Sequence, residues 1–275
     1  MGAPGGAAPP EAPPAYMQSR IWREEPEADN PFAARAAYCH GYDIYGDMLG
    51  HAGWADMIYL LFRGEAPSPS QAEALELLAV ALANPGPREA SVHAAMCGGV
   101  GGSPAAASLM AALAVGAGSL GGAREVFLAM EAWAECGRNV GAWEKRWADP
   151  APEQVGVWPG AEHPAGFDPH GVTASTPVRQ VLDGLSGLDP ASHAAWLRAN
   201  RPALEKAAGH PLSLVAAAAA AFVDLGFSPA EGEMLFLLMR LPGAAAHALE
   251  QRGLGHKRFP FYRLDLQDGP REKRP

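Results

Sequence analysis

A run of six alanines, residues 216–221, constrains what this chain can fold into more than any other feature. Alanine has the smallest side chain that a helix uses readily, so the run predicts a helix that neighbouring elements approach closely. Leu214, Val215, Phe222 and Val223 flank the run, which favours a central, buried helix over a low-complexity segment on the surface.

Composition extends this expectation to the rest of the chain. Hydrophobic residues make up 48% of the 275 residues and charged residues 19%, which allows a substantial core. Alanine and glycine dominate the apolar share, and the valine, isoleucine and aromatic runs typical of strands are nearly absent. We therefore expect an all-α protein made of closely packed helices.

Apolar periodicity and helix breakers divide the chain into segments. Ser68 is expected to cap a helix that begins at Pro69, with Gln71 completing a capping box, and this helix ends before the Asn-Pro-Gly-Pro sequence at 84–87. Residues 148–178 are rich in proline and glycine and are expected to be irregular. The other segments expected to be helical are 54–63, 90–96, 104–116, 123–138, 190–208, 212–225, 229–239 and 244–252.

The N-terminal residues, one apolar stretch and the cysteines indicate the cellular compartment of the protein. Residues 1–30 are rich in alanine, proline and glycine, and we expect a disordered tail, neither a signal peptide nor a membrane helix. Residues 100–123 are apolar through glycine and alanine, which favours a buried helix over a membrane span. Cys39, Cys97 and Cys136 are odd in number and have no paired spacing, so reduced thiols in a cytoplasmic protein are expected.

Several functional classes find no support in the sequence. The formal net charge is −9 with no Lys/Arg cluster apart from the short 271–274 sequence, so neither nucleic acid nor membrane is expected as a partner. Histidines and carboxylates show no metal-ligand spacing, so no metal is expected. The glycines at 98–102 lack the Lys-Ser/Thr ending of a phosphate loop and are interpreted as a helix break.

An ordered set of short motifs runs through residues 38–265. Its members are His40–Ile44, Tyr59–Pro67, Gly121–Ala123, Trp158–Pro164 followed by Asp168-Pro169, Asp224–Phe227, Arg240–Glu250 and Arg258–Pro260. The set resembles the citrate synthase superfamily, and within it the bacterial citryl-CoA lyase-like branch best.

The resemblance implies an all-α, citrate synthase-like homodimer with an active-site cleft between a large helical domain and an inserted small helical domain. Residues 31–123 and 226–265 would form the large domain, and residues 124–225 the small domain. Residues 1–30 and 266–275 would be tails.

The family's chemistry needs a carboxylate that deprotonates the acyl-CoA carbon, a histidine that stabilises the enol and a second histidine that polarises the acceptor carbonyl. The resemblance puts His163 at the second-histidine position, Leu120 at the first and Val215 at the carboxylate position. A shifted register does not restore the missing groups, because residues 94–162 contain no histidine and residues 206–223 no carboxylate. We expect Leu120, His163 and Val215 to line one pocket that lacks two of the three catalytic groups.

The resemblance also implies residues that bind a substrate carboxylate. Arg240 occupies the position of an arginine that grips such a group, the alternative being a salt bridge on the helix surface. His170 stands where the family often has another arginine, and Arg179 lies near enough to substitute for it. Arg258 corresponds to an arginine lent across the dimer. The ligand implied is a coenzyme A thioester, as substrate or as bound molecule, together with a small carboxylic acid.

Two hypotheses about function follow. In the first, the protein is an enzyme that acts on a CoA thioester and a carboxylic acid, by carbon–carbon bond cleavage or Claisen-type condensation. In the second, it is a catalytically inactive paralogue that binds a metabolite, or pairs with an intact homologue as a regulatory or scaffolding subunit. The absent base favours the second for citrate chemistry itself, whereas the retained His163 and Arg240 favour the first.

Overall fold

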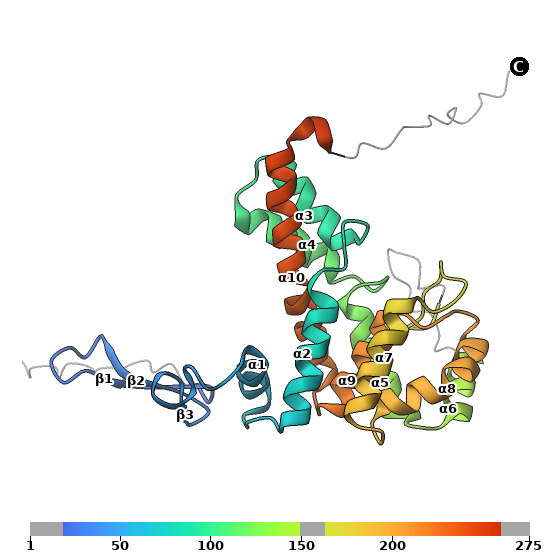
Figure 1. Cartoon of the computed structure of the whole chain (residues 1–275), viewed down its shortest axis with the longest axis horizontal. Helices are drawn as coiled ribbons and strands as arrows, with labels where there is room; N and C mark the ends of the chain where they lie inside the picture. Colours follow the sequence, from blue (N-terminus) through green and yellow to red (C-terminus); the bar gives the residue numbers. More distant parts are fainter. Residues whose placement is uncertain (1–18, 149–162, 260–275) are drawn as a thin grey trace, which may run out of the picture. The chain divides into compact units, whose positions relative to one another are not determined.

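The computed structural model describes residues 19–148 and 163–259 (Figure 1). Helices predominate in this part of the chain, as the expected all-α class requires, but a small sheet accompanies them. The described residues divide into two compact units, one ending at Pro67 and the other beginning at Ser68. None of the described helices combines the length and the hydropathy that a membrane span requires.

The first unit contains the sheet, which the sequence analysis did not predict. Strands β1 (Trp22–Pro26), β2 (Ala34–Cys39) and β3 (Tyr42–Asp43) pair antiparallel in that order. Residues 22–26 were expected to belong to the disordered tail, and this expectation is wrong. The composition did not indicate these strands, because cross-strand pairs that include polar side chains stabilise them. For example, the Arg23 guanidinium lies 3.8 Å from the centroid of the Tyr38 ring on the neighbouring strand.

A tight turn and two helices complete the first unit. His40 and Gly41, with φ of 47° and 93°, form the turn between β2 and β3 and supply the two positive φ values that a two-residue hairpin loop of type I′ needs. A π-helix, η1 (Ile44–Met48), and an α-helix, α1 (Trp54–Arg63), follow. The bounds of α1 are those expected from the sequence.

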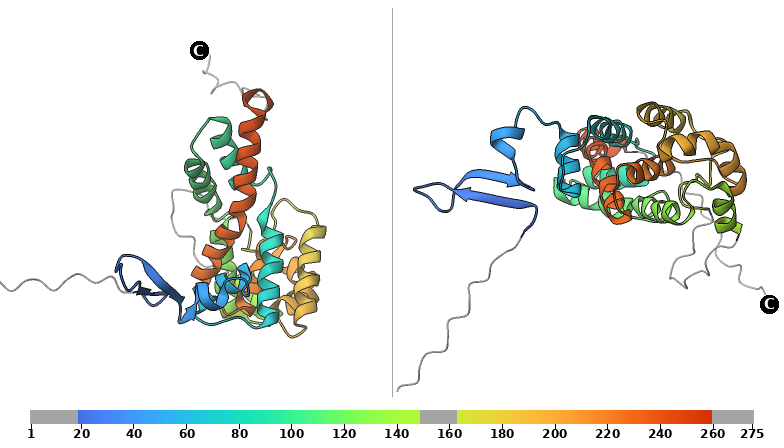
Figure 2. Two further views of the ribbon diagram at one scale, coloured as in Figure 1. Left: turned by 60° about the vertical axis from the view of Figure 1, so that its left-hand side comes forward. Right: turned by 90° about the horizontal axis from the view of Figure 1, so that it is seen from below.

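The second unit is helical. Its elements are α2 (Pro69–Ala83), α3 (Ala90–Val100), α4 (Ala105–Gly116), α5 (Ala123–Cys136), α6 (Val140–Ala148), α7 (Thr176–Leu188), α8 (His193–Ala208), α9 (Leu214–Asp224), α10 (Pro229–Leu254) and the 3₁₀ turn η2 (His256–Arg258). Figures 1 and 2 show α3 and α4 packed along one end of α10, with α5 and α9 at its other end.

The predicted start of α2 is confirmed in detail. The Ser68 hydroxyl accepts a hydrogen bond from the Gln71 backbone N–H, and the Gln71 side chain accepts one from the Ser68 N–H. This reciprocal pair satisfies two donors that a helix start leaves without intrahelical partners. Ser228 and Glu231 repeat the arrangement at the start of α10.

The alanine run forms the buried middle of α9, as predicted. Residues 217–220 are fully buried, and α9 contacts α5, α7, α8 and α10. Side chains of one methyl group let four helices approach a single axis closely, which larger residues would prevent.

Helix α10 runs unbroken where the sequence analysis placed an interruption at 241–243. Pro242 lies inside the helix, at the cost of one backbone hydrogen bond. Gly243 is buried against the end of α2, where a Cβ atom would stand 2.4 Å from the Ala83 carbonyl oxygen. Pro242 and Gly243 therefore do not end the helix. They lie where α10 packs closely against the end of α2.

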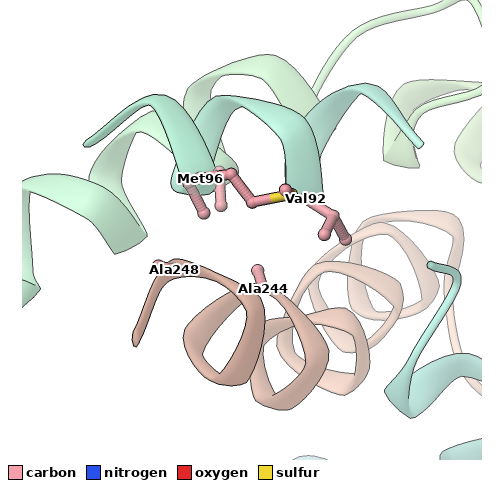
Figure 3. Packing of buried hydrophobic residues seen from close by; sticks show 6 residues of the cluster. Val92, Met96, Ala244 and Ala248 are labelled. Atoms are coloured by element: carbon pink, nitrogen blue, oxygen red, sulfur yellow. The ribbon is translucent and has the colours of Figure 1, made fainter. Parts of the chain in front are cut away.

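Helices α3, α4 and α10 share a core of small side chains (Figure 3). Val92, Met96, Ala244 and Ala248 meet between α3 and α10. The backbones come so close that a Cβ atom on Gly99 would lie 2.2 Å from the Ala248 carbonyl oxygen. Of the glycines interpreted as a helix break, Gly98 and Gly99 therefore belong to α3 as packing residues, and the break begins only at Gly101.

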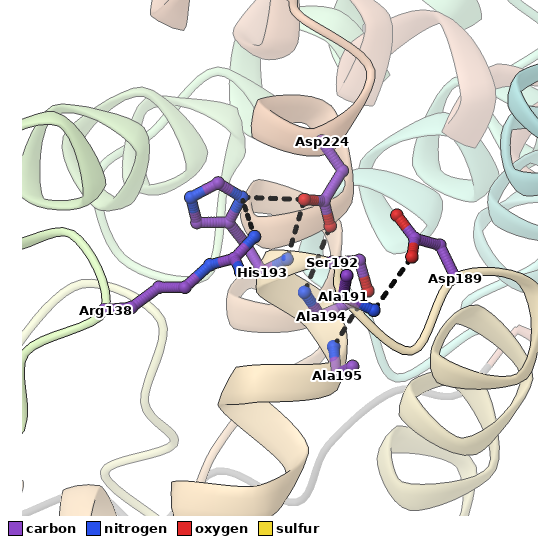
Figure 4. A network of polar contacts seen from close by, with 8 residues as sticks. All are labelled: Arg138, Asp189, Ala191, Ser192, His193, Ala194, Ala195 and Asp224. Carbon is purple, nitrogen blue, oxygen red and sulfur yellow. Dashed lines mark hydrogen bonds and ion pairs between the residues drawn. The ribbon is translucent and has the colours of Figure 1, made fainter.

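Asp224, at the end of α9, anchors the start of α8 (Figure 4). Its carboxylate accepts hydrogen bonds from the His193 and Ala194 backbone N–H groups and lies 2.7 Å from the His193 ring. A carboxylate at a helix N-terminus satisfies open donors and complements the helix dipole. Asp224 thus couples the ends of two helices that surround the alanine core.

We predict that Gly99→Ala lowers the free energy of unfolding by about 1–3 kcal/mol, because the added methyl group has no room against the α10 backbone. Gly187, an exposed glycine in α7 with nothing near its Cβ direction, is the matched control. Gly187→Ala should raise the same quantity by roughly 0.5–1 kcal/mol through helix propensity. Urea unfolding followed by circular dichroism measures both; equal effects of the two changes would contradict the packing argument.

Candidate functional site

A cavity of about 540 Å³ lies within the second unit. Five stretches of the described chain supply its walls; the lining residues are Leu82, Pro85, Glu89, Leu120, Gly121, Glu125, His163, Phe167, Asp168, Pro169, His170, Ser213, Leu214, Val215, Phe236 and Arg240. Its size is typical of cavities that bind small molecules or parts of cofactors.

Two glycines shape the turn that carries Leu120 into this cavity. Gly121 has a φ of +71°, which favours glycine, and a Cβ atom on Gly122 would lie 2.3 Å from the Gly118 carbonyl oxygen. Leu120 precedes this turn, lines the cavity and is 65% exposed. The backbone of this turn therefore requires both glycines, whichever side chain stands at position 120.

Backbone hydrogen bonds join the loop after His163 to the segment that leads into α9. The Asp168 N–H donates to the Pro211 carbonyl (2.8 Å), and the Ser213 N–H donates to the Gly166 carbonyl (2.9 Å). Phe167 and Leu212 form an isolated antiparallel bridge between these two bonds. The pairing holds the two segments side by side.

Leu120, His163 and Val215 all line the same cavity, the arrangement expected from the sequence. They come from the turn before α5, the loop after residue 162 and the first turn of α9. The leucine and the valine offer no group that exchanges a proton or donates a hydrogen bond. Of these three side chains, only His163 does.

Glu125 is the site residue that the sequence analysis missed. It lies in the first turn of α5, is 2% exposed, and accepts hydrogen bonds from the Gly121 N–H (2.6 Å) and the Gly166 N–H (2.8 Å). Its Oε1 lies 3.6 Å from His163 Nε2. The family motif indicates a base only in the segment before Asp224, whereas this carboxylate is five residues after Leu120.

Burial raises the pKa of the Glu125 carboxyl above its ordinary value, while the Gly166 and Gly121 N–H groups and His163 oppose the rise. A carboxyl with a raised pKa, in contact with an imidazole, can hold or release a proton inside the cavity. Beside His163 the cavity therefore holds a second group that can exchange a proton, one that the motif pattern did not indicate.

Arg240 is buried in the cavity wall and is not part of a helix-surface salt bridge. Its Nη2 lies 2.5 Å from Glu89 Oε1, and its Nη1 donates to the Gly121 carbonyl at 3.4 Å. Burial lowers the pKa of the guanidinium, and Glu89 opposes this. A ligand carboxylate would reach this cation only by competing with Glu89.

The remaining predicted binding residues divide into two groups. His170 lines the cavity at an exposed position, and its N–H donates to Asp168 Oδ1 (2.9 Å). Arg179, on α7, donates to the Thr176 hydroxyl, and Arg258 lies exposed in η2; neither lines the cavity. The segment 158–162 of the histidine loop lies outside the described residues.

Ser213 adds a polar group that lacks a partner. Its Oγ is buried, lines the cavity wall and makes no hydrogen bond within the described structure. A buried hydroxyl without a partner is unfavourable, so a ligand that bonds to it gains affinity. Within residues 19–148 and 163–259, no three histidine, cysteine or acidic side chains gather as metal ligands would.

Comparison with solved structures identifies the class: the chain has the fold of the citrate synthase superfamily. Citryl-CoA lyase from Hydrogenobacter thermophilus matches with a TM-score of 0.72 at 19% identity, covering 94% of this chain and 97% of the other. ATP citrate lyase from Methanothrix soehngenii, in complex with citrate and coenzyme A, matches at 0.71 and 18%, and this chain spans 43% of its length.

A citrate synthase is also among the matches. The Thermoplasma acidophilum enzyme, in a ternary complex with carboxymethyl coenzyme A and oxaloacetate, matches with a TM-score of 0.56 at 17% identity. The alignment covers 81% of this chain and 58% of that one. No protein-family model matches the sequence, and no curated protein matches it either.

We predict that stability depends on pH through Glu125. Because its pKa is raised on folding, the folded state binds the proton more tightly, and the free energy of unfolding falls as pH rises above about 4.5, the ordinary glutamate value. Glu125→Gln removes this part of the slope and, by losing one backbone acceptor, lowers stability by about 1–3 kcal/mol.

Urea unfolding between pH 4.5 and 7.5 measures both effects. The control is Glu73→Gln, an exposed glutamate on α2, which should keep the slope of the unchanged protein. A Glu125→Gln protein whose stability falls with pH as steeply as that of the unchanged protein would contradict the assignment.

Proposed function

We propose that the protein binds a coenzyme A thioester in the cavity around His163 and does not perform citrate-type carbon–carbon chemistry. The observation that carries the proposal is the lining of this cavity, where Leu120 and Val215 stand beside His163. The fold shared with citryl-CoA lyase, ATP citrate lyase and citrate synthase supports the choice of ligand.

Citrate-type carbon–carbon chemistry passes through an enol of the acyl group. Its formation needs a base at the acyl carbon and a hydrogen-bond donor at the thioester oxygen. By the family resemblance, these are the positions of Val215 and Leu120, and neither side chain supplies the group. His163 remains able to donate to a carbonyl, which orients a bound thioester without cleaving it.

A second function, an acyl-CoA enzyme with altered chemistry, is favoured by one observation. Glu125 is a buried carboxyl next to His163 in the cavity, and the two could share a proton that moves to or from a ligand. In that case His163 would be catalytic, and Glu125 would position it and set its protonation.

We predict that calorimetry detects binding of acetyl-CoA, and that no turnover occurs with citryl-CoA, malyl-CoA or acetyl-CoA plus oxaloacetate. His163→Ala should weaken acetyl-CoA binding several-fold, because it removes the donor to the thioester. His247→Ala is the matched control, since His247 lies on α10 outside the cavity lining and bonds to Asn84.

The possible outcomes separate the two functions. Carbon–carbon cleavage or condensation by the unchanged protein would contradict the first proposal. Turnover of another acyl-CoA, lost in both His163→Ala and Glu125→Gln proteins that remain folded, would establish the second. Failure to bind any CoA compound would contradict both.

We further infer a homodimer, with α4 in the interface; an intact homologue as partner is the alternative. Residues 105–116 include no charged side chain, yet Met110 is 67% exposed and Val115 is also exposed. An apolar face of this kind is more often an interaction surface than a solvated one. Closed twofold dimers are the commonest assembly of such chains.

Sedimentation velocity tests this inference. We predict a dimer for the unchanged protein and a monomer for Met110→Glu, because a buried charge without a partner opposes association. Val80→Glu, at a 71% exposed position on α2, is the control and should leave the dimer intact. A monomeric unchanged protein, or a Met110→Glu dimer as tight as the control, would contradict the α4 interface.

The state of the cysteines supports a proposal about the cellular compartment of the protein. Cys39, Cys97 and Cys136 are all free, and burial raises the pKa of the Cys39 and Cys136 thiols, which disfavours their reactive thiolate forms. Free thiols are typical of a reducing compartment, and we propose the cytoplasm.

A further inference from the structure

The charges in the cavity disfavour a ligand that carries carboxylates of its own. Among the described lining residues, the carboxyl groups of Glu89, Glu125 and Asp168 accompany one guanidinium, that of Arg240, so they outnumber it even when Glu125 holds a proton. Glu89 already neutralises this guanidinium at 2.5 Å. An entering carboxylate would lose its hydration and meet more negative than positive charge.

The apolar part of the wall favours a hydrocarbon group. Leu82, Val215 and Phe236 line the cavity and are buried, whereas Leu120 lines it and is 65% exposed. A ligand that covers Leu120 removes its apolar surface from water, which stabilises the complex. The exposed leucine thus marks where an apolar group of the ligand gains most.

Ser213 and His163 supply a limited polar complement. The Ser213 Oγ is buried and lacks a hydrogen-bond partner within the described structure, and His163 lines the same cavity. A single carbonyl oxygen can accept from a hydroxyl and an imidazole, and needs no counter-charge. The lining therefore matches one carbonyl attached to an apolar chain.

We propose that the cavity selects an uncharged, apolar acyl group and rejects acyl groups that end in a carboxylate. Glu89 is a specificity-determining residue in this scheme, because it occupies the guanidinium that a ligand carboxylate would need. The inference rests on the proposed function, in which the acyl group arrives as a coenzyme A thioester.

Valeryl-CoA and glutaryl-CoA test the proposal, because both carry a five-carbon acyl group and differ in a terminal methyl or carboxylate. Calorimetry on the full chain should give at least a tenfold tighter dissociation constant for valeryl-CoA. Glutaryl-CoA binding as tightly or more tightly would overturn the acyl selectivity while leaving CoA thioester binding intact. Binding of neither thioester, nor of CoA, would overturn the proposed function and this inference with it.

Leu120→Asn tests the apolar contact. It should weaken valeryl-CoA binding about fivefold or more and change glutaryl-CoA binding less. Leu249→Asn is the matched control, because Leu249 on α10 is 64% exposed and lies outside the cavity lining. Equal valeryl-CoA affinities of the two variants would overturn the role of Leu120.

Glu89→Gln tests the charge argument. The amide keeps an oxygen that can accept from the Ser91 and Val92 N–H groups at the start of α3, so the fold should persist, which thermal unfolding checks. With its carboxylate gone, Arg240 is free to meet the ligand, and the preference for valeryl-CoA should shrink at least fivefold. An unchanged preference in a folded Glu89→Gln protein would overturn the role of Glu89.

Discussion

The Glu125 carboxylate accepts backbone N–H groups from two loops that are far apart in the sequence, one through Gly121 and the other through Gly166. These bonds hold the turn that carries Leu120 against the loop that carries His163. The same carboxylate lies beside the His163 ring. Two of the five stretches that line the cavity therefore depend on one buried group at the start of α5, and a change in its protonation would alter the hydrogen bonds that hold them.

The lining of the cavity combines polar side chains with hydrocarbon. His163 and the buried Arg240 line it together with Leu120 and Val215. The arginine is paired with Glu89. Hydrocarbon side chains at positions 120 and 215 affect what the cavity can hold more than whether it exists, because its walls are set by backbone hydrogen bonds and helix packing.

Local physics accounts for most of the helices that the sequence predicted. The Ser68 capping box and the alanine run act over a few residues, so their outcome is readable without the fold. The sheet of residues 22–43 and the continuity of α10 through Pro242 depend instead on contacts between distant residues, such as Arg23 with Tyr38 and Gly243 with the end of α2. Helix α7 was not predicted, because its first turn falls in the proline- and glycine-rich region 148–178, although Val178, Leu182 and Leu185 have helical spacing.

By itself, the sequence determined which side chains stand at positions 120, 163 and 215, and the order of motifs that predicted the fold. It also determined the starts of α2 and α10, because caps act through neighbouring backbone groups. Only the tertiary structure decided that Glu125 reaches His163 and that Glu89 neutralises Arg240. Both pairings join different elements, and burial and ion pairing depend on distances in space that spacing along the chain does not set.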